Sequence, residues 1–364
     1  MRIAIISPYQ LRLKRGIERV NWSLAGEFAK QGAATDLFVW GDPKPVSWGA
    51  LPEGVRFRKV PYSRYYMARW AAPFYWWWLR QTHYDWVIVA FAGYGEAAAL
   101  RRSKRQKICM ILHYPYQQVP HRYAEFKATG LAECATLMVG VSQFTARGAE
   151  AFFGKPCHAM PNGVDAEVFK PSDAMRAEMR QRLGISPTAP VIITTAALEE
   201  RKGVQHVIRV VAALKPTMPN LQYWVLGEGP YRPDLARLIG DLQVSDQVHL
   251  IGSVNDVVPY LAMADVGCLL SYGEAFGITL VEYMAMQLPC IASQHPPFDE
   301  IIRPDYGLML DEKQPDTLVN ALCDLLNNPA KRQKMGLAGR QQALAAYSWR
   351  EIAAQYLALF RTHG

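Results

Sequence analysis

Two glutamates, Glu274 and Glu282, stand eight residues apart around a Phe-Gly pair in the segment SYGEAFGITLVEYMA, residues 271–285. Paired carboxylates can hydrolyse a glycosidic bond by acid–base chemistry, and they can also hold the hydroxyl groups of a sugar nucleotide. The pattern predicts that Ser271 ends a strand, that residues 272–277 turn, and that a helix runs from about Ile278 to Met286. One glutamate then lies at the mouth of a turn and the other inside a helix. This favours sugar-nucleotide binding over a hydrolytic pair flanking one bond at roughly 5–10 Å.

The turn also creates a helix start with donors for an anion. We expect the amides near Phe276, Gly277 and Ile278 to form a free helix N-terminus, whose partial positive charge and N–H donors suit a diphosphate, and we expect Ala275 to belong to the same donor-binding turn. Gly277 lets the backbone come close to a ligand. Lys202, which follows another predicted strand, can offset the negative charge that builds on a departing diphosphate.

Length and composition predict a globular protein of two domains. The chain has 364 residues, of which half are hydrophobic and a fifth are charged. Its six cysteines include no Cys-x-x-Cys pair, which is typical of a reduced, cytoplasmic protein. The start MRIAIISPY reads as a buried strand rather than a signal peptide, and no apolar run approaches the ~20 residues of a membrane-spanning helix.

The positive charge lies in one half of the chain. Residues 1–168 hold 22 Lys and Arg against 12 Asp and Glu, whereas residues 169–364 hold 18 against 20. The sequence shows no helix-turn-helix, zinc or RNA-binding signature, so we expect no nucleic-acid partner. An anionic membrane surface or a phosphate-bearing acceptor explains the basic half equally well.

Apolar strand-like runs alternate with helical patterns along the whole chain. This predicts an α/β fold in which two doubly wound, Rossmann-like domains face a central cleft. We expect an N-terminal domain at residues 1–168 and a C-terminal domain at residues 169–348. An amphipathic helix at about 349–364 is expected to pack back. The predicted strands lie in RIAIISPY, ATDLFVW, DWVIVAF, KICMILHY, TLMVGVS, APVIITTAAL, LQYWVLG, QVHLIG, VGCLLS and PCIAS.

The ordered motifs resemble the retaining glycosyltransferases of family four, also called group one, which have the GT-B fold. The resemblance spans nearly the whole chain. Its motifs are RGIERVNWSLAGEFAKQG, ILHYPY, VSQFTARG, MPNGVDAEVF, LEERKGVQHVI, VLGEGP, VHLIGSVNDVVPYLAMADV, the Glu-x7-Glu pair and YSWREIA. Each motif is weak alone, and their order and spacing together are specific.

The resemblance implies roles for the residues of the second half. Glu274 would contact the donor sugar, Glu282 would hold the ribose hydroxyls, and Lys202 would act on the diphosphate. Family members usually carry an arginine within a Gly-Arg-Leu run, where this chain has alanine at Ala197. Arg201 is then the expected substitute, whereas a solvated charged turn is the alternative.

Further roles are implied elsewhere in the chain. His113 would approach the donor sugar, Gly16 would border the diphosphate, and the backbone at Val254 would meet the base. At the end of the Glu282 helix, the family's glycine is replaced by Gln287. A left-handed glutamine there costs ~1 kcal/mol.

The implied activity is metal-independent transfer of a hexosyl unit, with retention, from a nucleotide-diphosphate sugar. We expect no cofactor and no metal, and the chain carries no Asp-x-Asp motif. The acceptor would be a glycan or lipid-linked molecule in bacterial cell-envelope, lipopolysaccharide or exopolysaccharide synthesis. The alternatives are a GT-B sugar-nucleotide epimerase and a catalytically impaired, glycan-binding relative.

Residues 56–86 mix arginines and aromatics in the basic half of the chain. Trp76, Trp77 and Trp78, beside Arg69 and Arg80, resemble the anchors of proteins that sit at the headgroup zone of a membrane. We therefore expect peripheral attachment to the inner face of the cytoplasmic membrane. The alternative is a helix packed on its own sheet with a solvated basic face.

Overall fold

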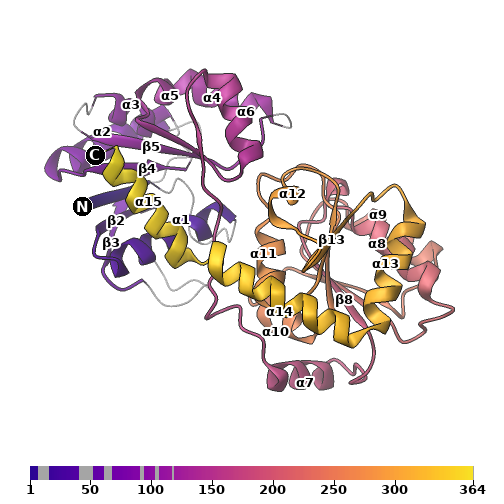
Figure 1. Ribbon diagram of the computed structural model, residues 1–364. Coiled ribbons are helices and arrows are strands. Elements are labelled where there is room, and N and C mark those ends of the chain that lie inside the picture. Colours follow the sequence, from indigo (N-terminus) through magenta and orange to yellow (C-terminus); the bar gives the residue numbers. More distant parts are fainter. Residues whose placement is uncertain are drawn as a thin grey trace. The chain divides into compact units, whose positions relative to one another are not determined.

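The computed structural model describes residues 1–6, 16–40, 52–60, 68–90, 94–102, 106–116 and 119–363 (Figure 1). The chain divides into two compact units. The N-terminal unit consists of Met1–Gly163 together with Trp349–Gly364, and the C-terminal unit is Val164–Ser348. Among the described residues, no helix has both the length and the apolar character needed to span a bilayer.

The N-terminal unit is a parallel sheet with the strand order β3-β2-β1-β4-β5-β6-β7. Every residue of β4 and β6 is buried, as expected for strands covered by helices on both faces. Its strands are β1 (Arg2–Ile6), β2 (Ala34–Trp40), β3 (Val55–Val60), β4 (Trp86–Val89), β5 (Lys107–Leu112), β6 (Leu137–Gly140) and β7 (His158–Ala159). Its helices are α1 (Gly16–Lys30), α2 (Ala68–Gln81), α3 (Tyr94–Arg102), α4 (Pro120–Thr129), α5 (Leu131–Cys134), α6 (Gln143–Phe153) and α15 (Trp349–Thr362).

The C-terminal unit is a second parallel sheet, with the order β10-β9-β8-β11-β12-β13. Its strands are β8 (Val191–Thr195), β9 (Gln222–Leu226), β10 (Val248–Gly252), β11 (Val266–Leu269), β12 (Cys290–Ser293) and β13 (Gly307–Leu310). Its helices are α7 (Asp173–Arg182), η2 (Glu200–Lys202), α8 (Val204–Leu214), α9 (Arg232–Asp241), α10 (Val258–Met263), α11 (Ile278–Ala285), α12 (Phe298–Ile301), α13 (Pro315–Asn327) and α14 (Pro329–Ala346). The predicted α/β fold with two doubly wound halves is confirmed.

The last helix, α15, packs on the N-terminal unit, where it lies alongside α1 (Figure 1). The ring of Phe360 stacks on Trp86 at 4.5 Å between centroids, and Tyr356 meets Phe28 edge-on. These aromatic contacts add to the area that the helix buries and hold it against the sheet. The end of the chain is thereby part of the core of the N-terminal unit.

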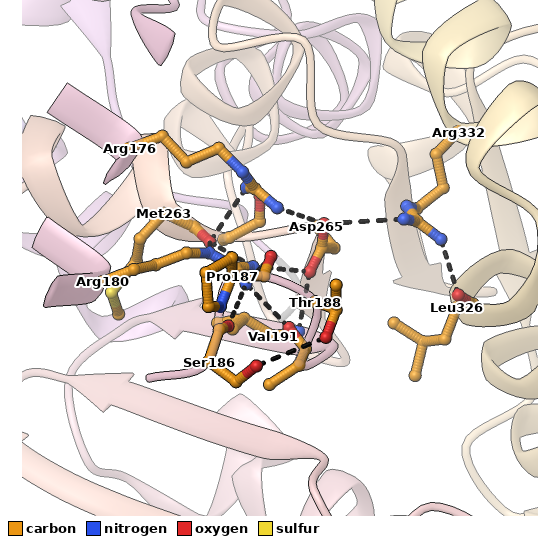
Figure 2. A network of polar contacts seen from close by, with 12 residues as sticks. Arg176, Arg180, Ser186, Pro187, Thr188, Val191, Met263, Asp265, Leu326 and Arg332 are labelled. Atoms are coloured by element: carbon orange, nitrogen blue, oxygen red, sulfur yellow. Dashed lines mark hydrogen bonds and ion pairs between the residues drawn. The ribbon is translucent and has the colours of Figure 1, made fainter. Parts of the chain in front are cut away.

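A buried carboxylate ties β8 to β11 at their amino ends (Figure 2). Asp265 pairs with Arg176 at 2.7 Å and with Arg180 at 2.9 Å, and it accepts the backbone N–H of Val191 at 2.8 Å. The buried Arg180 also donates to the carbonyl oxygens of Met263 and three residues before β8. The buried charges are therefore paired and hydrogen-bonded, as buried charges must be.

Replacing Asp265 with asparagine should destabilise the protein by about 3 kcal/mol, because Arg180 would keep a buried charge without its counter-ion. Urea unfolding measures the loss. The control is Asp246→Asn, which removes an ion pair to Lys215 where 61% of the Asp246 side chain is exposed. That change should stay within about 0.5 kcal/mol. Equal losses for the two variants would contradict this role of Asp265.

Candidate functional site

The Glu274 turn and the Lys202 turn follow neighbouring strands in the middle of the C-terminal sheet. Lys202 ends the turn after β8, and Glu274 lies in the turn after β11. The two strands pair directly, and the chain reverses its direction of winding between them, since β9 and β10 lie on one side and β12 and β13 on the other. Ligands of open α/β sheets bind at the carboxyl ends of strands at such a switch point.

Lys202 and Glu274 form an ion pair at this point. Their side chains are only 12% and 18% exposed, so the pair is largely withdrawn from water. Ser271 donates its hydroxyl to the same carboxylate oxygen at 2.8 Å. Burial alone would raise the pKa of Glu274, but the charge of Lys202 and the hydrogen bonds from Lys202 and Ser271 outweigh it and lower that pKa. The carboxylate is therefore ionised and already oriented.

A glycine allows the two turns to approach each other. Gly203 follows Lys202 with a φ of 70°, and a Cβ there would lie 2.1 Å from the carbonyl oxygen of Leu270, at the end of β11. No other residue fits this position without moving a backbone. The hydroxyl of Ser293 anchors the same region from β12, since it donates to the carbonyl of Ser271 at 2.5 Å.

Arg201 bridges the two turns rather than lying in solvent. Its guanidinium donates to Glu199 at 2.6 Å and to the carbonyl oxygen of Gly273 at 3.1 Å. Its own carbonyl accepts the N–H of Tyr272 at 2.9 Å. The arginine thus stands beside Glu274, and its charge is one of the causes that lower the pKa of that carboxyl. Ala197 leaves the earlier position of this loop without a cation.

Helix α11 begins at the Glu274 turn. Gly277 precedes it with a φ of 109°, and no side chain among the described residues caps this start. Phe276 is buried and meets the ring of Tyr347 at 5.8 Å, whereas Ala275 and Ile278 are half-buried. The helix start therefore leaves backbone donors available next to Glu274.

The far side of α11 is attached to the end of β8. Tyr283 accepts the N–H of Thr195 at 2.8 Å, and Thr279 donates its hydroxyl to the Thr195 carbonyl at 3.3 Å. Sequence reasoning missed Ser271, Thr279 and Tyr283. The sequence did contain a signal for them. Thr279 and Tyr283 are polar residues four positions apart on one face of an apolar helix, and Ser271 is a polar residue at the end of an apolar strand.

Glu282 and Val254 occupy other parts of the C-terminal unit. Glu282 lies on α11 and is buried. Val254 is half-buried and follows β10, at the edge of the sheet. The glycine turn after β9 leads toward it, since Gly227 donates its N–H to the carbonyl of Gly252 at 2.9 Å. The described contacts give no direct link between Val254 and the Lys202–Glu274 pair.

His113 and Gly16 belong to the N-terminal unit. His113 directly follows β5, and its Nε2 atom is buried without a hydrogen-bond partner among the described residues. Burial lowers the pKa of His113 to about 4, so the imidazole is neutral at pH 7. Gly16 is the first residue of α1 and is exposed. Residues 7–15, which precede it in the sequence, lie outside the described residues.

Helix α11 ends at a glutamine in the left-handed conformation, as the sequence allowed. Gln287 has a φ of 59°, and the N–H of Leu288 donates back to Tyr283 at 2.9 Å. Gln243 ends α9 in the same way, with a φ of 54°. Both residues occupy a position that helices usually give to glycine.

Comparison with known proteins places these features in context. Residues 175–342 match the family described as "Glycosyl transferases group 1", and residues 14–168 match "Glycosyltransferase Family 4". A "GDP-mannose-dependent monoacylated alpha-(1-6)-phosphatidylinositol monomannoside mannosyltransferase" of Corynebacterium glutamicum is 31% identical over 57% of this chain. A "Lipopolysaccharide core biosynthesis glycosyltransferase" of Rhizobium meliloti is 29% identical over 50% of it. The chain covers 58% and 52% of the lengths of these two relatives.

Among solved structures, Anabaena Alr3699/HepE in complex with UDP superposes on the chain with a TM-score of 0.81. The match covers all of both chains at 18% sequence identity. A sucrose-phosphate synthase of Thermosynechococcus elongatus gives a TM-score of 0.79 at 21% identity and covers 100% of this chain and 98% of its own. At these identities the likeness concerns the fold.

The buried Nε2 atom of His113 should make stability depend on pH. Its folded pKa of about 4 lies below the ordinary 6.5, so the unfolded chain takes up a proton first as the pH falls. Stability present above pH 6.5 should be lost between pH 6.5 and 4, by up to about 3 kcal/mol. We expect His113→Gln to remove this part of the pH dependence in urea unfolding. The same change at the exposed His121 should not, and parallel curves for wild type and His113→Gln would contradict the assignment.

The two left-handed glutamines generate a second prediction. Gln243→Gly and Gln287→Gly should each stabilise the protein by up to about 1 kcal/mol, because glycine adopts a positive φ without strain. The melting temperature measures the gain. Alanine at either position retains the strain and serves as the control. The gain in melting temperature should be easier to interpret at Gln243, because this side chain is exposed. A glycine variant that is no more stable than the alanine variant at the same position would show that the strain is absent.

Proposed function

This chain belongs to the group 1 glycosyltransferases, and we propose that it moves a hexosyl unit from a nucleotide-diphosphate sugar to a glycan or lipid-linked acceptor. The observation that carries the proposal is the ion pair of Lys202 and Glu274 at the switch point, beside the uncapped start of α11. A cation, a helix start and an oriented carboxylate are the groups that a sugar diphosphate needs.

The ion pair suggests how the donor is taken up. Before binding, Glu274 neutralises Lys202, and the pair is nearly dehydrated. An arriving diphosphate offers Lys202 a stronger negative charge and also meets the amides at Gly277 and Ile278. Lys202 then turns to the phosphate, and Glu274 becomes available to accept hydrogen bonds from the hydroxyls of the sugar. Binding of the diphosphate therefore frees the Glu274 carboxylate to bind the sugar of the same donor.

The remaining groups of the C-terminal unit complete the proposed donor site. Glu282 is assigned to the ribose hydroxyls, and the backbone near Val254 is assigned to the base. Arg201 is the second cation, since it stands at the same turn and Ala197 supplies none. His113 and Gly16 lie in the N-terminal unit, and their roles at the donor sugar and the diphosphate stay predictions.

The proposed reaction breaks the bond between the anomeric carbon and the diphosphate oxygen. The acceptor oxygen bonds to the same face of that carbon, and the departing phosphate oxygen takes the acceptor proton. Configuration is thereby retained. Lys202, Arg201 and the start of α11 supply the positive charge for the leaving group, so the proposed reaction requires neither a metal nor a cofactor.

The names of the relatives suggest donors and acceptors to test first. The Corynebacterium relative is GDP-mannose-dependent and acts on a phosphatidylinositol mannoside, and HepE has been seen with UDP and with UDP-glucose. We therefore propose cell-envelope or exopolysaccharide glycan, free or lipid-linked, as the acceptor class. The work would take place at the inner face of the cytoplasmic membrane.

Release of nucleoside diphosphate from GDP-mannose or UDP-glucose, in the presence of bacterial lipid extract, tests the function. NMR of the product at the anomeric position tests retention, and excess EDTA tests metal independence. Release that is the same without acceptor, with free sugar as the product, would overturn transfer. Ala197 favours the second candidate, a catalytically impaired glycan-binding relative, which would bind glycan without releasing nucleotide.

Two substitutions at the ion pair should act in opposite directions on nucleotide binding. Lys202→Met should weaken the binding of GDP or UDP by about tenfold to a hundredfold, because one charge-assisted hydrogen bond is lost. Glu274→Gln should bind the same nucleotide several-fold more tightly, because Lys202 is no longer neutralised, and yet transfer on the order of a hundredfold more slowly. Calorimetry and initial rates measure the two effects.

Lys215→Met is the matched control, since Lys215 makes an exposed ion pair in the same unit. It should change neither binding nor rate. Parallel weakening of nucleotide binding in Lys202→Met and Glu274→Gln would indicate that the pair serves stability alone.

A further inference from the structure

We propose that the exposed aromatic face of α2 docks the N-terminal unit onto an anionic lipid bilayer. The observation is a gathering of three large aromatic side chains in water on one helix. Phe74 is 52% exposed, Trp76 is 38% exposed and Trp77 is 50% exposed. Isolated apolar side chains on a surface are ordinary, but a contiguous aromatic face indicates a binding surface.

The helix separates its aromatic residues into a core side and an outer side. Tyr75 and Leu79 are buried and pack into the core of the N-terminal unit. Trp77 lies three residues from both Phe74 and Arg80, so these side chains share the opposite face. Trp78, expected from the sequence to be a third anchor, instead packs partly buried against the core. The side chain of Arg69 lies outside the described residues.

Arginines accompany the aromatic face. The guanidinium of Arg80 lies 5.0 Å from the centre of the Trp76 ring, and that of Arg58 lies 4.4 Å from the Trp78 ring. Arg58 is held there by the fully buried Asp36, which it meets at 2.8 Å. A cation stacked on an indole keeps its hydrogen-bond donors for a second anion. The outer face of α2 therefore presents exposed indoles with the Arg80 guanidinium stacked on one of them, whereas Arg58 lies on the partly buried Trp78.

This combination fits the headgroup zone of a bilayer. Tryptophan prefers the boundary between water and hydrocarbon, and arginine is attracted by anionic lipids. The charge of the chain agrees, because its excess of Lys and Arg lies entirely in residues 1–168. The alternative of a solvated basic face does not account for two indoles that are 38% and 50% exposed.

The docking surface belongs to the N-terminal unit, whereas Lys202 and Glu274 belong to the C-terminal unit, and docking needs no catalytic activity. It complements the proposed function by bringing the enzyme to the surface where a lipid-linked acceptor is found. A failure of docking would leave sugar transfer to soluble acceptors intact, and a failure of transfer would leave docking intact.

Flotation of the full chain with vesicles tests the proposal. Vesicles of phosphatidylcholine alone are compared with vesicles containing one third phosphatidylglycerol. We expect flotation with the anionic vesicles only, and its loss at high salt, since screening weakens the charge term. The double variant Trp76→Ala/Trp77→Ala should need at least tenfold more lipid for half-maximal flotation.

The chain offers a matched control on α14. Leu337 and Leu344 are 52% and 41% exposed in the C-terminal unit, and the double variant Leu337→Ala/Leu344→Ala should float like wild type. Circular dichroism and melting temperature establish that each variant is folded. Arg80→Gln should reduce flotation several-fold, and brominated lipids should quench wild-type tryptophan fluorescence more than that of the Trp76→Ala/Trp77→Ala variant.

Three outcomes would overturn the proposal. The wild-type protein does not float with anionic vesicles, or the tryptophan variant floats as well as wild type. The third outcome is that the wild-type protein sediments as a dimer and the tryptophan variant sediments as a monomer. This would show that a second copy of the chain covers this face.

Discussion

The ion pair between Lys202 and Glu274 is largely withdrawn from water, so the residues around it must supply further hydrogen bonds and allow the two turns to approach each other. Two charges withdrawn from water are tolerated only when each is paired and further hydrogen-bonded. Ser271 supplies an additional bond to the carboxylate, and Arg201 fastens the two turns together. Gly203 permits the approach at all, because any larger residue would meet the end of β11. The pair is thus the product of backbone geometry as much as of its two side chains.

Strands β8 and β11 are joined at both ends. The Asp265 network joins their amino ends, and the Lys202–Glu274 pair joins the turns at their carboxyl ends. At the amino ends of β8 and β11, Asp265 forms ion pairs with three arginines, Arg176, Arg180 and Arg332, and accepts a backbone N–H, so its charge is fully compensated. At the carboxyl ends, the pair stands beside a helix start that no described side chain caps. One edge of the sheet is thus held by a saturated network. At the other edge, the backbone N–H groups of Gly277 and Ile278 at the helix start are the donors that we propose for a ligand.

Much of this arrangement could be predicted from the sequence, and the reasons for the rest are physical. Long apolar runs predicted the buried strands, and the turn residues before Ile278 predicted the start of the helix. The strands β3, β7 and β13 were missed. Charged residues interrupt β3, β7 has only two residues, and most of β13 is only half-buried. The contact of Lys202 with Glu274 depends on which strands are neighbours, and local pattern does not contain that order. The direction of Arg201 and the burial of His113 likewise depend on the tertiary structure.

The two units differ in net charge, and the difference agrees with the distance over which a charge acts in each. A buried cation acts strongly over a few ångströms, whereas exposed cations are screened by salt. The C-terminal unit holds Lys202, for which we propose an anionic ligand, although residues 169–364 carry a slight acidic excess. A largely buried ammonium needs no positive field around it, since an ion in a low dielectric acts strongly over a few ångströms. A surface that meets many lipid headgroups has the opposite need. Its cations lie in water, where each is screened beyond about 8 Å, so attraction must be built from many of them. The basic excess therefore matches the broad contact that we propose for the N-terminal unit, whereas the proposed donor site depends on two cations, Lys202 and Arg201, at one turn.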